Sequence, residues 1–259
     1  MPYATLEAER DGPAFIITLK RPERRNALSR QAAAEIIDAA RRGEADAAAH
    51  AVIVTGGLRY FSAGADLTEA INVQPDTAAE YFRGFHRLAE TLEALQKPVL
   101  AAIEGFCFTG GLELALACDI RIGAEGSSYT ITSARIGTVA GAGGTQRLPR
   151  TIGTARALEM LFAAESIDAA EAYRIGLINR LVPKGDALAE AKRMAELYAT
   201  RGPLSHALMK RAVHQGLQMD LKAGLELEVE LATKAYGTKD KQEGISAFLE
   251  KRPAKFRGE

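Results

Sequence analysis

The sequence predicts an α/β domain followed by a helical C-terminal region. Through the first two-thirds of the chain, short apolar runs of strand character alternate with longer segments of helical periodicity, which is the pattern of an α/β domain. From about residue 153 onward the strand signal fades and helical patterns dominate. We therefore expect a core over residues 1–195 and a helical region over residues 196–259, whose faces pack on the core or on a neighbouring subunit.

Strands and helices are expected to alternate as far as residue 103. The strands are short runs of Ala, Val, Ile, Leu and Phe, whereas the helices are longer segments in which apolar residues share one face. Ser29 is a candidate N-cap, because its hydroxyl can accept from a free N–H of the helix that follows. Pro98 ends the second helix, since the residue before a proline avoids the helical conformation. The strands are predicted at 14–19, 51–55 and 99–103, and the helices at 32–42 and 77–95.

The remainder of the chain is expected to hold two more strands and then mainly helices. A short helix is predicted at 112–118, and the strands at 120–122 and 129–131. The later helices are predicted at 155–163, 169–173, 187–200, 204–218 and 221–236.

Two turns made of small residues, at 61–66 and 108–113, are the most informative local feature. Each follows an apolar strand-like run and opens into a helical pattern. Gly and Ala allow a ligand to approach the backbone, and N–H groups at a helix start are unpaired and lie at the positive end of the helix dipole. Two such turns that face each other could hold one carbonyl oxygen as an oxyanion. Glu113 would then stand close enough to move a proton.

Composition and charge exclude several classes of function. Lys plus Arg and Asp plus Glu both number 33, so no net charge attracts nucleic acid or an anionic membrane. No apolar run approaches the roughly 18–20 residues of a membrane span, and the N-terminus lacks the apolar core of a signal peptide. Cys107 and Cys118 lie in apolar stretches, which favours buried reduced thiols and a cytoplasmic protein.

Motifs of other enzyme classes are missing from the sequence. There is no Gly-Lys-Ser/Thr phosphate loop, no complete dinucleotide fingerprint and no Gly-x-Ser-x-Gly elbow. The histidines show no metal-ligand spacing with one another or with cysteine, so no metal site is predicted. Kinase, dehydrogenase and serine-hydrolase functions are therefore not expected.

Eight short stretches, taken in order, carry a family resemblance. They are 19–22, 26–28, 62–66, 97–99, 110–113, 117–119, 141–148 and 243–252. Together they resemble the crotonase, or enoyl-CoA hydratase/isomerase, superfamily over essentially the whole chain. The resemblance implies a spiral of ββα units with a helical C-terminal region that trimerises, as a homotrimer or a dimer of trimers. It also implies an acyl-CoA thioester substrate and no metal or redox cofactor, since coenzyme A is part of the substrate.

The resemblance also implies roles for individual residues. Ala65 and Gly110 would supply the two backbone N–H groups that hold the thioester carbonyl as it becomes an enolate, and Glu113 matches the first of two acid/base glutamates. Arg24 and Arg25 match the nucleotide end of the coenzyme A site, although they could equally be a solvated charge run. The residues expected along coenzyme A are Arg24, Arg25, Ala63, Ala65, Asp66, Leu67, Phe248 and Lys251, the last two from this or a neighbouring subunit.

Ser133 is the main departure from the family pattern. Hydratases of the family place a second glutamate four residues before the glycine that is matched here by Gly137. A serine hydroxyl can hydrogen-bond a water molecule, but it is a poor general acid or base near neutral pH. Loss of one such group costs roughly 10²–10⁴-fold in rate. Ser133 is interpreted as a helix N-cap or as a residue facing the substrate, and the two roles are compatible. A smaller departure is Ala140, where many relatives carry proline.

The sequence leaves more than one function open. The first hypothesis is hydration or double-bond isomerisation of an enoyl-CoA, with Glu113 as the main proton carrier. Other reactions of the family, namely decarboxylation, hydrolysis or chemistry on a ring substrate, are alternatives, as is an acyl-CoA-binding protein without catalysis. RNA binding is a minor alternative, which the zero net charge disfavours. His86 lies in a segment that borders the acyl pocket in relatives, and we expect a structural role for it.

Overall fold

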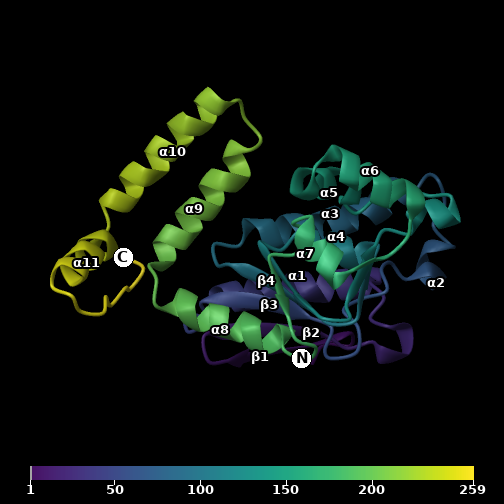
Figure 1. The fold of residues 1–259 in the computed structure, drawn as a ribbon, viewed down its shortest axis with the longest axis horizontal. Coiled ribbons are helices and arrows are strands. Elements are labelled where there is room, and N and C mark those ends of the chain that lie inside the picture. The colour runs from purple at the N-terminus through teal and green to yellow at the C-terminus, as the bar shows by residue number, and fades with distance from the viewer. Residues whose placement is uncertain (1) are drawn as a thin grey trace.

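A six-stranded mixed sheet lies at the centre of the computed structural model, which describes residues 2–259 (Figure 1). The strand order is β1-β2-β3-β4-β6-β9; β1 runs antiparallel to β2, and every other neighbouring pair is parallel. The strands are β1 (Leu6–Asp11), β2 (Ala14–Leu19), β3 (Ala51–Thr55), β4 (Val99–Ile103), β6 (Ile120–Ala124) and β9 (Arg180–Val182).

The central strands are buried on both faces because successive side chains point to opposite sides of the sheet. On one face, Ile17 and Val54 pack with residues of α1 (Arg30–Ala45) and α3 (Ala78–Ala94). On the other face, residues such as Ile53 and Leu100 pack against the Ala-rich side of α8 (Ala187–Ala199). Burial on both sides explains why these strands are unbroken apolar runs in the sequence.

A second, three-stranded sheet carries the chain to the small-residue turn at 108–113. It contains β5 (Phe106–Phe108), β7 (Ser128–Thr130) and β8 (Ile167–Asp168) in the order β5-β7-β8. The shorter helices around the two sheets are η1 (Pro22–Arg24), α2 (Leu67–Ala70), α4 (Gly110–Leu116), η2 (Ser133–Ile136), α5 (Gly144–Ile152), α6 (Thr154–Ala163) and α7 (Ala169–Arg174).

The C-terminal helices stand away from the sheets. The helices α9 (Pro203–Gly216) and α10 (Leu221–Tyr236) form an antiparallel hairpin, and α11 (Lys239–Leu249) and the C-terminus lie beyond it (Figure 1). The second half of α9 is tied to the core by Asp119, whose carboxylate lies 2.8 Å from Lys210 Nζ and 3.2 Å from His214 Nε2. None of the helices within residues 2–259 combines the length and apolar character needed to cross a membrane.

Most predicted elements are confirmed, and some were missed. The predicted strands 14–19, 51–55 and 99–103 coincide with β2, β3 and β4, and the predicted helices agree with the observed ones to within a few residues. Helices do dominate after residue 153, but β8 and β9 also lie there, and β9 supplies an edge strand of the main sheet. The strands β1, β5, β8 and β9 and the helices α5 and α11 were not predicted. The domain boundary proposed after residue 195 lies within α8 and stays a prediction.

Candidate active site

Two neighbouring segments hold the first small-residue turn, residues 61–66, in place. The Ser62 carbonyl accepts from the Phe108 N–H in β5 at 2.9 Å, and the Ser62 hydroxyl donates to the Asn26 carbonyl at 2.7 Å. The side-chain amide of Asn26 in turn donates to the Gly56 and Phe61 carbonyls at 3.0 and 3.2 Å. The first turn is thereby fixed against the strand that leads into the second turn.

The backbone N–H of Ala65 is free of hydrogen bonds on the side that faces the second turn. Leu28 forms a short parallel bridge with Ala65: its N–H donates to the Gly64 carbonyl at 2.7 Å and its carbonyl accepts from the Asp66 N–H at 2.9 Å. Both bonds therefore use the neighbours of Ala65, whose own N–H points away from Leu28. Within residues 2–259 this N–H has no acceptor.

The second turn is held by an unusual conformation of Thr109. This residue has φ 44° and ψ −112°, which is sterically unfavourable for a β-branched side chain. Its N–H donates to the Thr130 carbonyl at 2.8 Å, and its hydroxyl lies 2.7 Å from the Thr132 hydroxyl. These contacts turn the chain sharply from β5 into α4. Gly110 is the first residue of α4, and its N–H, too, has no acceptor in the described part of the chain.

The two turns meet at Gly64, Ala65 and Gly110. A Cβ atom built on Gly110 would lie 3.1 Å from the Ala65 nitrogen, and one built on Gly64 would lie 3.2 Å from the Gly110 nitrogen. Gly64 also has φ +104°, in the left-handed region that favours glycine. Two unpaired N–H groups thus lie side by side. A carbonyl oxygen placed between them could accept from both, which is the arrangement of an oxyanion hole.

Glu113 lies in the first turn of α4 and is only 3% exposed. Its Oε1 atom accepts from the Ala142 and Gly144 N–H groups at 2.9 and 2.8 Å. Burial raises the pKa of this carboxyl above its ordinary value, whereas the two N–H donors and the charges of His86 and Arg147 oppose that rise only in part. A carboxyl whose pKa is raised by burial is better suited to both accepting and returning a proton than an ordinary one.

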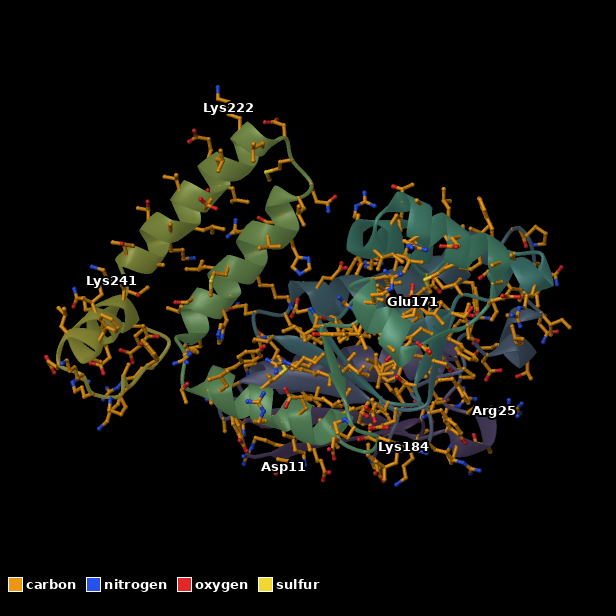
Figure 2. The ribbon with its side chains drawn as sticks, viewed as in Figure 1. Asp11, Arg25, Glu171, Lys184, Lys222 and Lys241 are labelled. Carbon is orange, nitrogen blue, oxygen red and sulfur yellow. The ribbon has the colours of Figure 1, made fainter. Side chains whose placement is uncertain are left out.

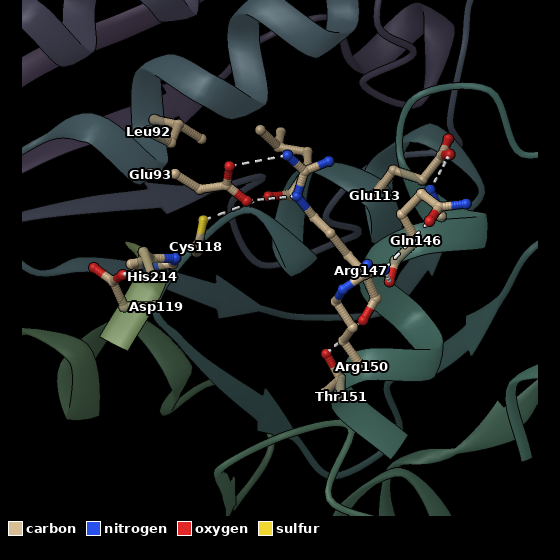
Figure 3. Close-up of polar contacts among 12 residues, drawn as sticks. Leu92, Glu93, Glu113, Cys118, Asp119, Gln146, Arg147, Arg150, Thr151 and His214 are labelled. Carbon is tan, nitrogen blue, oxygen red and sulfur yellow. Dashed lines mark hydrogen bonds and ion pairs between the residues drawn. The ribbon is translucent and has the colours of Figure 1, made fainter. Parts of the chain in front are cut away.

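The loop that holds Glu113 leads into α5. Arg147, on the first turns of α5, forms a two-point ion pair with Glu93 of α3, with N–O distances of 2.6 and 3.0 Å (Figure 3). The Arg147 guanidinium folds back over Gly143, which has φ +107°. A Cβ atom on residue 143 would lie only 2.0 Å from Arg147 Nη1, so glycine fits this position best. The backbone donors of this loop therefore have a fixed position relative to α3.

Gly110 and Glu113 line one small pocket with apolar walls. The pocket has a volume of about 10 Å³. An apolar enclosure lowers the local dielectric constant and strengthens the interaction of backbone N–H groups with a developing negative charge. The other residues that line the pocket are Leu28, Phe85, Leu88, Ala89, Leu114 and Ala142.

Ser133 does not act as a helix cap. It is the first residue of η2, the cap position belongs to Thr132, and no side chain caps this helix, so the N-cap interpretation was wrong. Ser133 is 5% exposed, and its hydroxyl forms no hydrogen bond within residues 2–259. It lies outside the set of residues that line the small pocket.

Most of the residues predicted along coenzyme A surround the first turn. Arg24 and Arg25 are exposed at the end of η1, and the Arg25 carbonyl accepts from the Ala63 N–H at 3.0 Å. Leu67 is 58% exposed. The Asp66 carboxylate is buried and already hydrogen-bonded within the protein: the Thr68 hydroxyl donates to it at 2.7 Å and the Arg21 guanidinium at 2.8 Å. Hydrogen bonds from Thr68 and then Arg21 hold the pKa of Asp66 below its ordinary value.

Phe248 and Lys251 are not brought to this site within one chain. Phe248 is 82% exposed near the end of α11, and Lys251 follows that helix. Figure 2 shows Lys241 of α11 and Arg25 at opposite ends of the molecule. A wider cleft with charged walls, between α11 and residues 252–259, lies at the same remote end.

The residues that hold Glu113 were not predicted as part of the site. Ala142 and Gly144 lie in a run of small residues before α5, which was a usable signal for free N–H groups at a helix start. His86 was expected to be structural, and its contact with this loop could not be foreseen. Within residues 2–259, no three His, Cys, Asp or Glu side chains gather closely enough to hold a metal ion.

Known proteins are similar to this chain in sequence and in fold. The family model for enoyl-CoA hydratase/isomerase matches residues 10–259. Crotonyl-CoA hydratase of Syntrophomonas wolfei is 37% identical over 257 residues, which are 99% of each chain, and 2,3-dehydroadipyl-CoA hydratase of Escherichia coli is 36% identical over 98% of each. The crystal structure of an enoyl-CoA hydratase from Bacillus anthracis superposes with a TM-score of 0.94 at 36% identity, covering 98% of this chain and 100% of that one.

Proposed function

The chain belongs to the enoyl-CoA hydratase/isomerase family, and we propose that it hydrates a short enoyl-CoA thioester with Glu113 as its single acid/base carboxylate. The predicted family resemblance and the crotonase fold are confirmed, and the protein is an enzyme of this family that acts on acyl-CoA. The observation that carries the finer proposal is that Gly110 and Glu113 line the same small apolar pocket. Crotonyl-CoA, the substrate named for a relative that is 37% identical, is a short enoyl-CoA.

In the proposed reaction the thioester carbonyl lies between the N–H groups of Ala65 and Gly110. Water adds its oxygen to C3 of the enoyl group, and the carbonyl oxygen becomes negatively charged as the C2=C3 electron pair moves toward it. The two N–H groups stabilise this enolate, and removal of one such donor typically costs about 10²–10³-fold in rate. The carboxylate of Glu113 accepts a proton from the attacking water.

A single carboxylate can complete the addition of water. After Glu113 has accepted the proton, the enolate carbon C2 takes the same proton back from it, so that one hydroxyl and one hydrogen have been added. In this proposal Ser133 holds the attacking water by a hydrogen bond and does not exchange protons, since a serine hydroxyl is a poor acid or base near neutral pH. We expect slower turnover than in a two-glutamate enzyme, by roughly 10²–10⁴-fold.

Analysis of the product tests this proposal. Purified protein is incubated with crotonyl-CoA, and the product is identified by mass. A hydroxyacyl-CoA heavier by one water is the expected result. An unchanged substrate after long incubation with a stoichiometric amount of protein would reject the proposal. Ser133→Ala should slow the reaction without abolishing it, whereas Ser133→Glu should accelerate it by restoring a second carboxylate.

Double-bond isomerisation is the second candidate, and it is favoured by the presence of one carboxylate in the pocket. A 1,3-proton shift needs only one base, because Glu113 can remove a proton from C2 and return it to C4. The enolate that forms is the one that Ala65 and Gly110 would hold. Incubation with a 3-enoyl-CoA distinguishes the two reactions: isomerisation produces the conjugated absorbance of a 2-enoyl-CoA without a gain in mass.

We propose that coenzyme A enters only as part of the substrate and that no metal or redox cofactor takes part. Arg24 and Arg25 would bind its phosphates, because the guanidinium group suits phosphate oxygens. Replacement of Arg25 by Ala should raise KM several-fold and leave kcat nearly unchanged, and an unchanged KM would remove Arg25 from the site. A cytoplasmic location is supported by the two buried free thiols, Cys107 and Cys118, and stays a prediction.

The exposed apolar residues of the C-terminal hairpin support a homotrimer or a dimer of trimers. Met209 and Val213 of α9 and Leu217 at its C-cap recur every four residues and are 57, 59 and 76% exposed. Such a stripe is typical of a helix face that another subunit covers. Assembly would also bring Phe248 and Lys251 to the coenzyme A of a neighbour. Light scattering at micromolar concentration should give three or six times the mass of one chain, and Val213→Glu should reduce it.

A further inference from the structure

One peptide group joins His86 to Glu113. The carbonyl of Gly141 lies 2.7 Å from His86 Nε2, and the N–H of the same peptide group, that of Ala142, donates to Glu113 Oε1 at 2.9 Å. Because a carbonyl oxygen can only accept, His86 Nε2 must carry the hydrogen in this contact. The hydrogen bonds therefore run in one direction, from the imidazole through the peptide group to the carboxylate.

The loop that contains this peptide group contacts helix α3 at two points. At one point, the ring of Phe82 packs on Gly141, and a Cβ atom on residue 141 would lie 2.5 Å from a ring carbon of Phe82. His86 follows Phe82 one helical turn later in α3. At the other, Glu93 binds Arg147 (Figure 3). Phe82 and Glu93 set the position of the loop. His86 alone among these contacts bonds to the peptide group that holds Glu113.

We infer that His86 is a positioning residue for Glu113, acting through the peptide group between Gly141 and Ala142. A donor on the carbonyl of a peptide group polarises that group and strengthens the hydrogen bond that its N–H donates, by roughly 10–30% per bond. His86 thus stabilises the ionised form of Glu113 and fixes the carboxylate in the pocket. Only the kinetic test of this inference rests on the proposed function, because the titration of Glu113 can be observed without turnover.

The other charged groups that act on Glu113 must be kept constant in a test. Arg147 of α5 and His86 of α3 are the charges that stabilise the Glu113 carboxylate, and the Arg147 charge is balanced by Glu93. His86 is exposed on its helix, so its replacement leaves the core intact. His86→Phe keeps a ring and removes the N–H donor. His86→Gln keeps an N–H donor and removes the imidazole charge.

The decisive measurement is the titration of the Glu113 carboxyl. Infrared difference spectroscopy of protein labelled with ¹³C-glutamate follows it, and the Glu113 band is identified by its absence in Glu113→Gln. In His86→Phe the Glu113 titration should move to higher pH by about half a pH unit or more, because the carboxylate loses part of its stabilisation. In His86→Gln it should stay at the wild-type position. Identical titrations in all three proteins would overturn the inference. A shift of the same size in His86→Gln and His86→Phe would overturn it too, since charge alone would then explain the effect.

Kinetics provide the second test. In His86→Phe, kcat for crotonyl-CoA hydration should fall about 3- to 10-fold at neutral pH with an unchanged KM, and His86→Gln should recover most of the loss. A rise in KM without a change in kcat would contradict a positioning role. Absence of hydration in the wild type would count against the proposed function, and the infrared titration would still decide the role of His86.

Discussion

Gly64 and Gly110 approach each other so closely that a Cβ atom on Gly64 would lie 3.2 Å from the Gly110 nitrogen and 3.0 Å from the Phe108 oxygen. The two turns are therefore in backbone contact at this point, with no room for a side chain. The proposed oxyanion hole lies beside this contact, so a methyl group on Gly64 would disturb the Gly110 N–H group that the thioester carbonyl needs.

We predict that Gly64→Ala lowers kcat/KM for crotonyl-CoA by about 10²–10³-fold, the usual cost of one lost oxyanion donor. The added methyl group crowds the Gly110 N–H, and φ +104° is strained for alanine. Gly84→Ala is the matched control, because a Cβ there meets only the flexible end of Arg87, at 3.8 Å. Gly64→Ala with half or more of the wild-type activity would argue against an oxyanion hole at this position.

Lys97 closes the C-terminal end of α1, and its removal should cost stability without affecting the site. Its ammonium group donates to the Gly43, Glu44 and Asp46 carbonyls at 2.9, 2.7 and 2.7 Å. Lys97→Met leaves these carbonyls without their donor, so the free energy of unfolding should fall by about 1–3 kcal/mol. Urea denaturation measures this loss. Lys184 is exposed, so Lys184→Met is the control. Equal stability of the two variants would contradict the role of Lys97 at the end of α1.

Glu113 should make the folded protein less stable at neutral pH than a neutral residue would. Its pKa is raised by burial in the folded state, so between the ordinary and the raised pKa the folded protein binds more protons than the unfolded one. Stability therefore falls as pH rises through that interval, and the loss is complete above it. Glu113→Gln removes this effect and keeps an acceptor for Ala142 and Gly144.

We accordingly predict that Glu113→Gln melts at a higher temperature than the wild type at pH 7, by about 1–4 °C. The difference should shrink as pH is lowered toward the ordinary range of a glutamate, where the wild-type carboxyl is protonated in both states. Calorimetry at several pH values checks the sign. A melting temperature of Glu113→Gln below that of the wild type at pH 7 would mean that the ionised carboxylate stabilises the fold.

The strands that could be predicted are those whose environment is uniform. β3 and β4 are buried along their whole length, so they appear in the sequence as unbroken apolar runs. β1 is an edge strand that is mostly exposed, and its polar sequence carries no such signal. α5 contains Pro149, which normally argues against a helix. Local patterns thus identify the centre of the sheet and miss its periphery.

The site could be predicted only where its parts lie next to each other in the sequence. Ala65, Gly110 and Glu113 belong to two turns with a recognisable composition, and the structure places these turns side by side. The contact of His86 with Gly141 joins residues 55 positions apart and depends on how α3 crosses the loop before α5. The location of Ser133 as the first residue of η2, one position after the cap position, likewise depends on how the chain leaves β7. Such contacts follow from tertiary packing, which one sequence does not reveal.

The central claim is that one carboxylate, Glu113, moves the proton in this active site. The measurement that tests it most directly is the loss of the conjugated enoyl absorbance of crotonyl-CoA with wild type and Glu113→Gln side by side. The account predicts clear turnover by the wild type and a fall of roughly 10²–10⁴-fold in the variant, which keeps the shape of the pocket and loses only the proton carrier. Turnover by Glu113→Gln within a factor of about three of the wild type would contradict it, because a group worth that little is not the general acid/base.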